Sequence, residues 1–386
     1  MKTTAPSYFR KFLFLMFSLL FFYSCSSGDD LEVVEEVADT PLETPTDTQD
    51  DDENEDNPNN PWQPMGTGMD DTVMTLMQFE DNLIAGGWFE KAGGENVGFV
   101  AQWDGSSWSK MGTGMDDIVY AFENYNGTLI AAGWFYKASG KSAFFIAYWD
   151  GSEWQPLGNG RREATLALTV FNNDLIAGGY SPDGGEDIER VARWDGTEWH
   201  PMGIGMNGPV WDLIVYKGEL IAAGYFNKAG GQTVNFIAKW DGNNWQPLGT
   251  GLNAGVEVLA VFEDELIVGG SFTNAGGITA NNIARWDGSQ WHSMGEGMKS
   301  TNGGVYSLTV FDDQLIAGGV FSQADGKDAN NIAAWDGEAW SPIGDGFNAW
   351  VPALATYKDT FVAGGDFNKS GTRPVSFISI YEEPEE

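Results

Sequence analysis

The sequence predicts an all-β fold, a seven-bladed β-propeller with four antiparallel strands per blade. The motif Trp-Asp-Gly recurs at spacings of 46, 45, 46, 46 and 49 residues, at Trp103, Trp149, Trp194, Trp240, Trp286 and Trp335. A second motif of the form Leu-Ile-Ala-Gly-Gly keeps step with it and occurs seven times, beginning at Leu83, Leu129, Leu175, Leu220, Leu266, Leu315 and Phe361. Units of roughly 40 to 50 residues with four short strands are typical of propeller blades.

Each repeat contains four segments that favour strands, as the sixth repeat shows. Its β-branched and aromatic residues predict strands over 305–311, 315–321, 331–335 and 340–343. Asp336-Gly337 between the last two segments is a strong hairpin signal, because glycine tolerates the positive φ of a tight turn.

Half a repeat stands at the start of the repeat region. Pro61–Gly68 (PWQPMGTG) matches only the second half of the motif, and one further period after Trp335 reaches Tyr381. We therefore expect the segment around Trp62 to be the outer strand of a blade whose other strands come from residues 351–381. This pairing would close the ring and protect sheet edges that are otherwise open to aggregation.

The double glycine that ends the second strand, followed by a loop and then an aromatic residue and a Trp, resembles kelch-type propellers and the propeller of galactose oxidase. The resemblance covers residues 62–382 and implies the propeller fold. It implies no single activity, because such propellers serve many functions. The copper-radical chemistry of galactose oxidase needs ligands and a cysteine that this domain lacks.

The N-terminal residues predict a lipoprotein signal peptide over residues 1–24. Lys2, Arg10 and Lys11 precede an apolar run, Phe12–Tyr23, which is shorter than the roughly 20 residues that span a bilayer. Cys25 is the only cysteine and stands where a bacterial lipoprotein carries its lipid. A free thiol inside a signal peptide is the alternative for Cys25.

Residues 25–61 are expected to be a disordered tether, and residues 62–386 the propeller. Gly28–Pro61 holds fourteen acidic residues and no Lys or Arg, so it should stay extended. The Ser and Asp residues directly after Cys25 resemble the signal that sends some Gram-negative lipoproteins to the cell surface. We therefore expect a lipid-anchored, surface-exposed protein of the outer membrane, attached to the membrane through that lipid alone.

Charge and composition limit the partners and cofactors. The propeller has 42 acidic and 17 basic residues, a net charge of −25, which argues against nucleic acid as a partner. His200 and His292 are the only histidines, and two isolated histidines make no metal site, so we expect no cofactor and no catalytic set. Calcium in a loop stays open, although no calcium-loop consensus is present. We expect a monomer that binds a glycan or a cell-envelope protein.

Aromatic residues at positions that vary between repeats are the candidate ligand-binding site. Directly after the Leu-Ile-Ala-Gly-Gly motif, four successive repeats carry Trp88, Trp134, Tyr180 and Tyr225, here called the aromatic arc. Trp211 and Trp350 begin first strands, which start on the face where second strands end. Aromatic rings on such a rim stack well on sugars. The alternative is that they fill gaps between loops.

Arg161 and Arg162 are the basic candidates for the same site. They interrupt an otherwise acidic set of loops on the same predicted face, where they could hold a carboxylate or sulfate. The alternative, which we favour, is that they pair with Glu163, Asp183 or Glu186.

Three function classes follow from these features. The first is a non-catalytic surface lipoprotein that binds a glycan or protein through one propeller face, and the aromatic arc favours it. The second is a polysaccharide-degrading lyase or hydrolase that uses a channel carboxylate such as Asp212 or Glu123. The third is an envelope scaffold without a ligand pocket.

Overall fold

The computed structural model describes residues 57–181 and 190–384, and these residues form strands, turns and loops without a helix. No helix in this part of the chain is long and apolar enough to cross a membrane. The signal peptide, Cys25 and the tether up to residue 56 lie outside the described residues.

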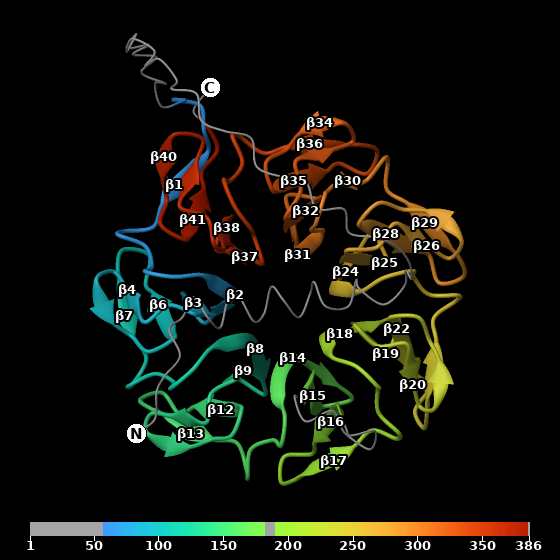
Figure 1. The fold of residues 1–386 in the computed structure, drawn as a ribbon. Helices are drawn as coiled ribbons and strands as arrows, with labels where there is room; N and C mark the ends of the chain where they lie inside the picture. The colour runs from blue at the N-terminus through green and yellow to red at the C-terminus, as the bar shows by residue number, and fades with distance from the viewer. Residues whose placement is uncertain (1–56, 182–189, 385–386) are drawn as a thin grey trace, which may run out of the picture. The chain divides into compact units, whose positions relative to one another are not determined.

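Seven four-stranded antiparallel sheets make up the described part of the chain (Figure 1), and each is named here by its first strand. The β2 sheet contains β2 (Val73–Phe79), β3 (Asn82–Gly87), β6 (Val100–Trp103) and β7 (Trp108–Lys110). The β8 sheet contains β8 (Val119–Tyr125), β9 (Thr128–Gly133), β12 (Ile146–Trp149) and β13 (Trp154–Pro156). The β14 sheet contains β14 (Ala164–Phe171), β15 (Asp174–Tyr180), β16 (Val191–Trp194) and β17 (Trp199–Pro201).

The β18, β24 and β31 sheets repeat the same order. The β18 sheet contains β18 (Val210–Tyr216), β19 (Glu219–Gly224), β22 (Ile237–Trp240) and β23 (Trp245–Pro247). The β24 sheet contains β24 (Val256–Phe262), β25 (Glu265–Gly270), β28 (Ile283–Trp286) and β29 (Trp291–Ser293). The β31 sheet contains β31 (Val305–Phe311), β32 (Gln314–Gly319), β35 (Ile332–Trp335) and β36 (Trp340–Pro342). Within each sheet, strands that follow one another along the chain are neighbours.

The β37 sheet combines the two ends of the described chain. Its order is β1 (Trp62–Pro64), β41 (Ile378–Tyr381), β38 (Thr360–Gly364) and β37 (Ala353–Tyr357). Trp62 lies opposite Tyr381, and the Glu382 N–H donates to the Pro61 carbonyl at 2.9 Å. The N-terminal and C-terminal half repeats therefore share one sheet, as the repeat count predicts.

Short hairpins extend the loops between second and third strands. They are formed by β4 (Lys91–Ala92) with β5 (Glu95–Asn96), β10 (Lys137–Ala138) with β11 (Lys141–Ser142), β20 (Lys228–Ala229) with β21 (Gln232–Thr233), β26 (Asn274–Ala275) with β27 (Ile278–Thr279), β33 (Gln323–Ala324) with β34 (Lys327–Asp328), and β39 (Lys369–Ser370) with β40 (Arg373–Pro374). In the sixth repeat β30 (Met298–Lys299) joins β33 as a third strand.

The first strands of successive sheets contact one another, and β37 contacts β2 as well as β31. Each sheet is open, with β1 or the fourth strand of its repeat at one edge. In six first strands one residue bulges out of the register, after the first pair in five strands and after the second pair in β14. These residues, here called the bulge positions, are Met74, Tyr120, Leu166, Trp211, Glu257 and Tyr306.

The core lies between sheets, and the second Trp of each motif fastens neighbouring sheets together. Trp62 is fully buried, packs on Phe347 with ring centroids 4.5 Å apart, and donates from Nε1 to the Ile343 carbonyl at 3.2 Å. Trp245 Nε1 donates in the same way to the Met202 carbonyl of the preceding repeat, at 2.9 Å. Trp108 and Trp340 repeat this hydrogen bond, whereas the Nε1 atoms of Trp154, Trp199 and Trp291 have no partner among the described residues, so burial of the ring is the more general role of this Trp.

The strand ends of the sixth repeat differ slightly from those that its sequence predicts. The second strand ends at Gly319 instead of residue 321, and the Val320 N–H donates instead to the Gly304 carbonyl at 2.9 Å. The third strand starts one residue later than expected, because Asn331 has a φ of 72°, which an extended strand does not accommodate. The fourth ends at Pro342, one residue early.

Candidate functional site

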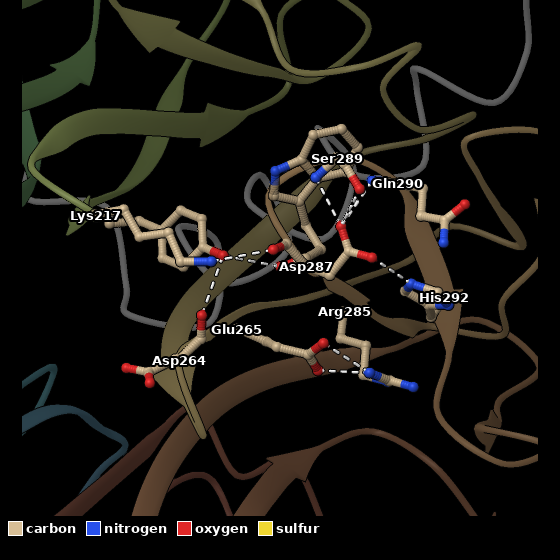
Figure 2. Close-up of polar contacts among 10 residues, drawn as sticks. Lys217, Asp264, Glu265, Arg285, Asp287, Ser289, Gln290 and His292 are labelled. Carbon is tan, nitrogen blue, oxygen red and sulfur yellow. Dashed lines mark hydrogen bonds and ion pairs between the residues drawn. The ribbon is translucent and has the colours of Figure 1, made fainter.

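The Trp-Asp-Gly turns have a structural role, because the aspartate side chain stabilises the hairpin turn. In the turn at Asp287, the Oδ1 atom accepts hydrogen bonds from the N–H groups of Ser289 and Gln290, at 2.6 and 2.9 Å (Figure 2). Equivalent bonds hold the pKa of Asp104 down at about 2, chiefly through the Ser106 hydroxyl. The aspartate of the motif thus closes a hairpin turn.

Both histidines belong to these turns. His292 Nε2 lies 2.8 Å from Asp287 Oδ2, and His200 Nε2 lies 2.7 Å from Asp195 Oδ2. In two other repeats a glutamine does the same, as where Gln246 Nε2 donates to Asp241 Oδ2 at 3.0 Å. Across the described ranges, no group of three or more His, Cys, Asp or Glu residues could hold a metal ion.

The aromatic arc follows the ends of second strands, where first strands begin. The Trp88 N–H donates to the Thr72 carbonyl at 2.9 Å, the Trp134 N–H to Ile118 at 2.9 Å and the Tyr225 N–H to Pro209 at 3.0 Å. Tyr180 ends β15 and pairs with Ala164, the first residue of β14. The backbone thus places all four arc residues at the same end of their sheets.

Three arc residues and Trp211 form one cluster with the neighbouring bulge positions. Trp88, Trp134, Tyr180 and Trp211 are half-buried, and they pack with Met74 against a buried group of Ile118, Tyr120 and Leu166. The rings of Trp134 and Tyr180 are nearly parallel, 15° apart, with centroids separated by 6.4 Å. Trp211 meets Tyr120 edge to face at 6.5 Å. Each of these rings is packed on one side and accessible in part.

Tyr225, the fourth arc residue, contacts a polar group. Its hydroxyl donates to Glu257 Oε1 at 2.5 Å and lies 3.4 Å from the Ser271 Oγ. Burial raises the pKa of Glu257 to about 7, and burial together with the Glu257 charge raises the pKa values of Tyr225 and Tyr306. The surroundings of the arc are therefore apolar in the first three repeats, and a polar side formed by Tyr225, Glu257, Ser271 and Tyr306 follows in the fourth to sixth.

Glu257 was not among the residues that the sequence singles out. It occupies a bulge position, where the other repeats carry Met, Tyr, Leu, Trp and Tyr. Comparing first strands residue by residue across the repeats would have found it, because it is the only acidic side chain at these positions. The bulge itself, which brings the residue to the edge of the strand, left no signal of its own in the sequence.

Trp350 lies on the polar side, three residues before β37, so it does not begin the first strand as expected. Its ring is half-buried and meets Tyr306 edge to face at 5.5 Å. The Nε1 atoms of Trp134 and Trp350 are buried and have no hydrogen-bond partner within the described part of the chain. Two indole donors at the same end of the sheets are thus left without an acceptor.

The structure separates the two candidate arginines. Arg161 is only 9% exposed, and its guanidinium carbon lies 5.2 Å from the centre of the Trp199 ring. It replaces a residue that is buried and apolar in the other repeats, such as Met115 or Met206. Arg162 is exposed. Arg161 is therefore part of the packing beside Trp199 rather than of an open surface.

Glu163 lies in the same buried group as Arg190. Both are 5% exposed, and the charge of Glu163 opposes the burial that lowers the pKa of Arg190. The pairing of Arg161 with Glu163 stays a prediction. Asp183 and Glu186, the other two predicted partners, lie outside the described residues.

The two carboxylates considered for catalysis are held apart. Asp212 Oδ1 accepts from the Leu213 N–H and Oδ2 from the Leu259 N–H, both at 2.7 Å, so its side chain joins β18 to β24. Burial raises the pKa of Asp212 to about 7 and that of Glu123 to about 7. Glu123 is on β8, and the β14 sheet lies between its sheet and that of Asp212.

Comparisons with known proteins address the fold. A family model described as "Domain of unknown function (DUF5122) beta-propeller" matches residues 264–286, and no curated protein matches the chain. The chain is similar to the WD40 β-propeller domain of Doa1, with 15% identity and a TM-score of 0.53 over 83% of this chain and 96% of that one.

The extracellular domain of BT4673 from B. thetaiotaomicron, described as a hybrid two-component system, is also similar. Its identity is 12% and its TM-score 0.56, over 83% of this chain but only 39% of the other. The present chain thus spans about two fifths of that protein. Together with the four-stranded antiparallel sheets, these likenesses show that the chain contains a β-propeller domain.

Proposed function

We propose that the seven sheets are the blades of one closed propeller of the kelch type, which holds a glycan-binding face on a lipid-anchored protein of the outer membrane. The pairing of β1 with β41 and the contacts of β37 with both β2 and β31 support closure. Because each edge strand then belongs to a blade that packs on its neighbours, the domain can act as a monomer.

The observation that carries the proposed function is the cluster of partly exposed rings from successive sheets. Trp88, Trp134 and Tyr180 come from three sheets, yet they pack on one buried group at one end of the first strands. Packing on one side fixes each ring, so little conformational entropy is lost when a ligand stacks on the other side. Contiguous exposed aromatic surface of this kind marks binding sites.

A neutral glycan suits this surface better than an acidic one. Sugar rings offer C–H groups that stack on aromatic faces such as those of Trp88 and Trp134. The net charge of the propeller is −25, so an acidic chain would be repelled. A cell-envelope protein is the other ligand class that such a face could bind.

A glycan array with the full chain tests this function. Trp88→Ala combined with Trp134→Ala should reduce capture of neutral glycans at least tenfold, since each stacking ring contributes on the order of 1 kcal/mol. Tyr136→Ala is the control, because Tyr136 is an exposed aromatic residue of the second repeat that lies outside the aromatic cluster. Equal capture by the double variant and the control would contradict a role for the arc.

The membrane attachment is proposed from the sequence alone. Cys25 is the only thiol available for acylation, so Cys25→Ala should abolish incorporation of labelled palmitate and release the protein from the outer membrane. Ser26→Ala leaves the thiol in place and serves as the control. Equal labelling of the Cys25 variant and the wild type would exclude the lipoprotein assignment.

A polysaccharide-degrading enzyme is the second candidate function, and Glu257 favours it. A carboxyl group with a pKa of about 7, hydrogen-bonded to Tyr225, has the properties of a general acid or base near neutral pH. Incubating neutral and acidic polysaccharides with the full chain and with Glu257→Gln distinguishes the two candidates. New reducing ends or unsaturated products that depend on Glu257 would show catalysis.

A further inference from the structure

A polar pocket lies at the sixth repeat, where the aromatic arc has ended. It has a volume of about 600 Å³. The residues that line it are Ser300, Thr301, Asn302, Val320, Phe321, Ser322, Asn330, Asn331, Asp345, Phe347, Asn348 and Gly371. Val320 stands at the position that Trp88 and Trp134 occupy in their repeats, so the pocket opens at the same end of the sheets as the arc.

A three-residue insertion builds one wall of this pocket. Six residues lie between Met298 and Val305, whereas three lie between Leu252 and Val256 and between the matching residues of the remaining repeats, and this explains the single spacing of 49. The inserted loop is pressed against the end of β32, since a Cβ atom on Gly303 would lie 2.5 Å from the Cβ of Val320. The other repeats lack these three residues.

The far wall is held rigid by side-chain amides. Asn331 accepts from the Phe321 N–H at 3.0 Å and donates to the Phe347 carbonyl at 2.8 Å. Asn330 donates to the Asp345 carbonyl at 3.0 Å, and Asp345 Oδ1 accepts from Asn57 at 2.9 Å. Phe321 and Phe347 are buried behind these groups. The pocket is therefore preorganised rather than formed by loose loops.

The chemistry of the lining selects a neutral, hydroxyl-rich ligand. Among the described residues, those that line the pocket include neutral hydroxyl and amide side chains and one carboxylate, Asp345. No Lys, Arg or His is among these lining residues. Phosphate and carboxylate ligands would thus meet no positive charge. The Ser300 Oγ is buried and has no hydrogen-bond partner within the described residues, so a ligand hydroxyl that reached it would satisfy a group that is otherwise costly to bury.

We propose that this pocket binds one neutral sugar unit of the glycan whose chain runs over the aromatic arc. The inference rests on the proposed glycan-binding function and adds a polar subsite in the sixth and seventh repeats to the stacking subsite in the first three. The two subsites thus lie in different repeats at the same end of the sheets. Stacking then provides affinity, and the pocket determines which sugar is accepted.

Hydrogen exchange of the full chain in detergent tests the pocket directly. The probes are glucose, galactose, mannose and N-acetylglucosamine at high concentration, with glucuronate as the acidic counterpart. At least one neutral sugar should protect the amides of residues 298–305 and 343–350, and glucuronate should protect neither. Protection by no neutral sugar, or equal protection by glucuronate, would overturn the proposal.

Two variants separate this subsite from the arc. Deleting Ser300–Asn302 leaves the loop as long as in the fifth repeat, so the fold should persist while protection of residues 343–350 disappears. Ser300→Ala should weaken binding of the protecting sugar about fivefold, the value of one neutral hydrogen bond. If the sugar still protected residues 343–350 after the deletion, the proposal that this pocket binds the sugar would be overturned.

The arc variants provide the complementary result. Trp88→Ala with Trp134→Ala should reduce capture on the array yet leave the protection of residues 343–350 by the monosaccharide unchanged. Loss of this protection in the arc variant would overturn the assignment of a separate polar subsite. If the arc variant still captured glycans on the array and residues 343–350 were still protected, the proposed role of the arc would be refuted and the proposed sugar subsite in the pocket would be supported.

Discussion

Tryptophan serves two regions of this molecule in different ways. The second Trp of the Trp-Asp-Gly motif is fully buried in several repeats, as at Trp154, Trp245 and Trp340, and it recurs in every sheet. The tryptophans of the arc, Trp88 and Trp134, are half-buried and occur in two neighbouring repeats only. Residues that every repeat shares are thus explained by packing between sheets. Residues that vary at one end of the sheets are available for a ligand.

The largest effect should come from removing the strand that joins the two ends of the chain. Deleting residues 61–66 removes β1, takes away the partner of β41 and leaves the carbonyl of Ile343 without the indole donor of Trp62. We expect aggregation through the open edge and a loss of most of the free energy of unfolding. Urea unfolding and light scattering measure both. An unchanged unfolding midpoint would show that the ends do not depend on each other.

A large loss is also expected from a single outer Trp. Trp245→Ala removes a fully buried ring and its hydrogen bond to the Met202 carbonyl, so the free energy of unfolding should fall by about 3–5 kcal/mol. Gln246→Ala changes the next residue, which is only partly buried, and should cost far less. A similar loss in both variants would remove the distinction between packing and surface in this strand.

A smaller effect is expected from pH, and it concerns the polar side of the arc. Burial raises the pKa of Glu257 from 4.5 to about 7, so its neutral form is favoured in the folded state. This contribution to stability is complete below pH 4.5 and is lost as the pH rises towards 7. Glu257→Gln should therefore gain stability relative to the wild type between pH 5 and pH 8. Parallel stability curves for the two proteins would exclude a buried, protonated Glu257.

Repeat spacing predicts most of the fold because each repeat must solve the same packing problem. The positions of Trp103, Leu83 and Tyr381 in the period were enough to predict four strands per sheet and the pairing of the terminal strands. Strand ends were less predictable. Asn331, for example, has a positive φ, and so have Phe99, Phe145, Phe236 and Phe377 at the same place in other repeats, so the type of side chain gives no signal for where this strand starts.

The site could be predicted only in part. Variation between repeats singled out Trp88 and Trp134, and the structure brings them into one cluster. The same reasoning placed Arg161 on a surface, whereas it is buried beside Trp199, because a long side chain can replace a buried methionine when an aromatic face is near. The proximity of Glu257 to Tyr225 depends on how neighbouring sheets pack, which one repeat does not reveal.

The central claim is that the arc tryptophans form a binding surface and the outer tryptophans form the core. Thermal and urea unfolding of two double variants, Trp88→Ala with Trp134→Ala and Trp245→Ala with Trp340→Ala, tests it without any ligand. We expect the arc variant to lose less than about 2 kcal/mol and the outer variant several times more, because only the outer rings are fully buried. Equal losses in the two variants would show that the arc is packing and not a site.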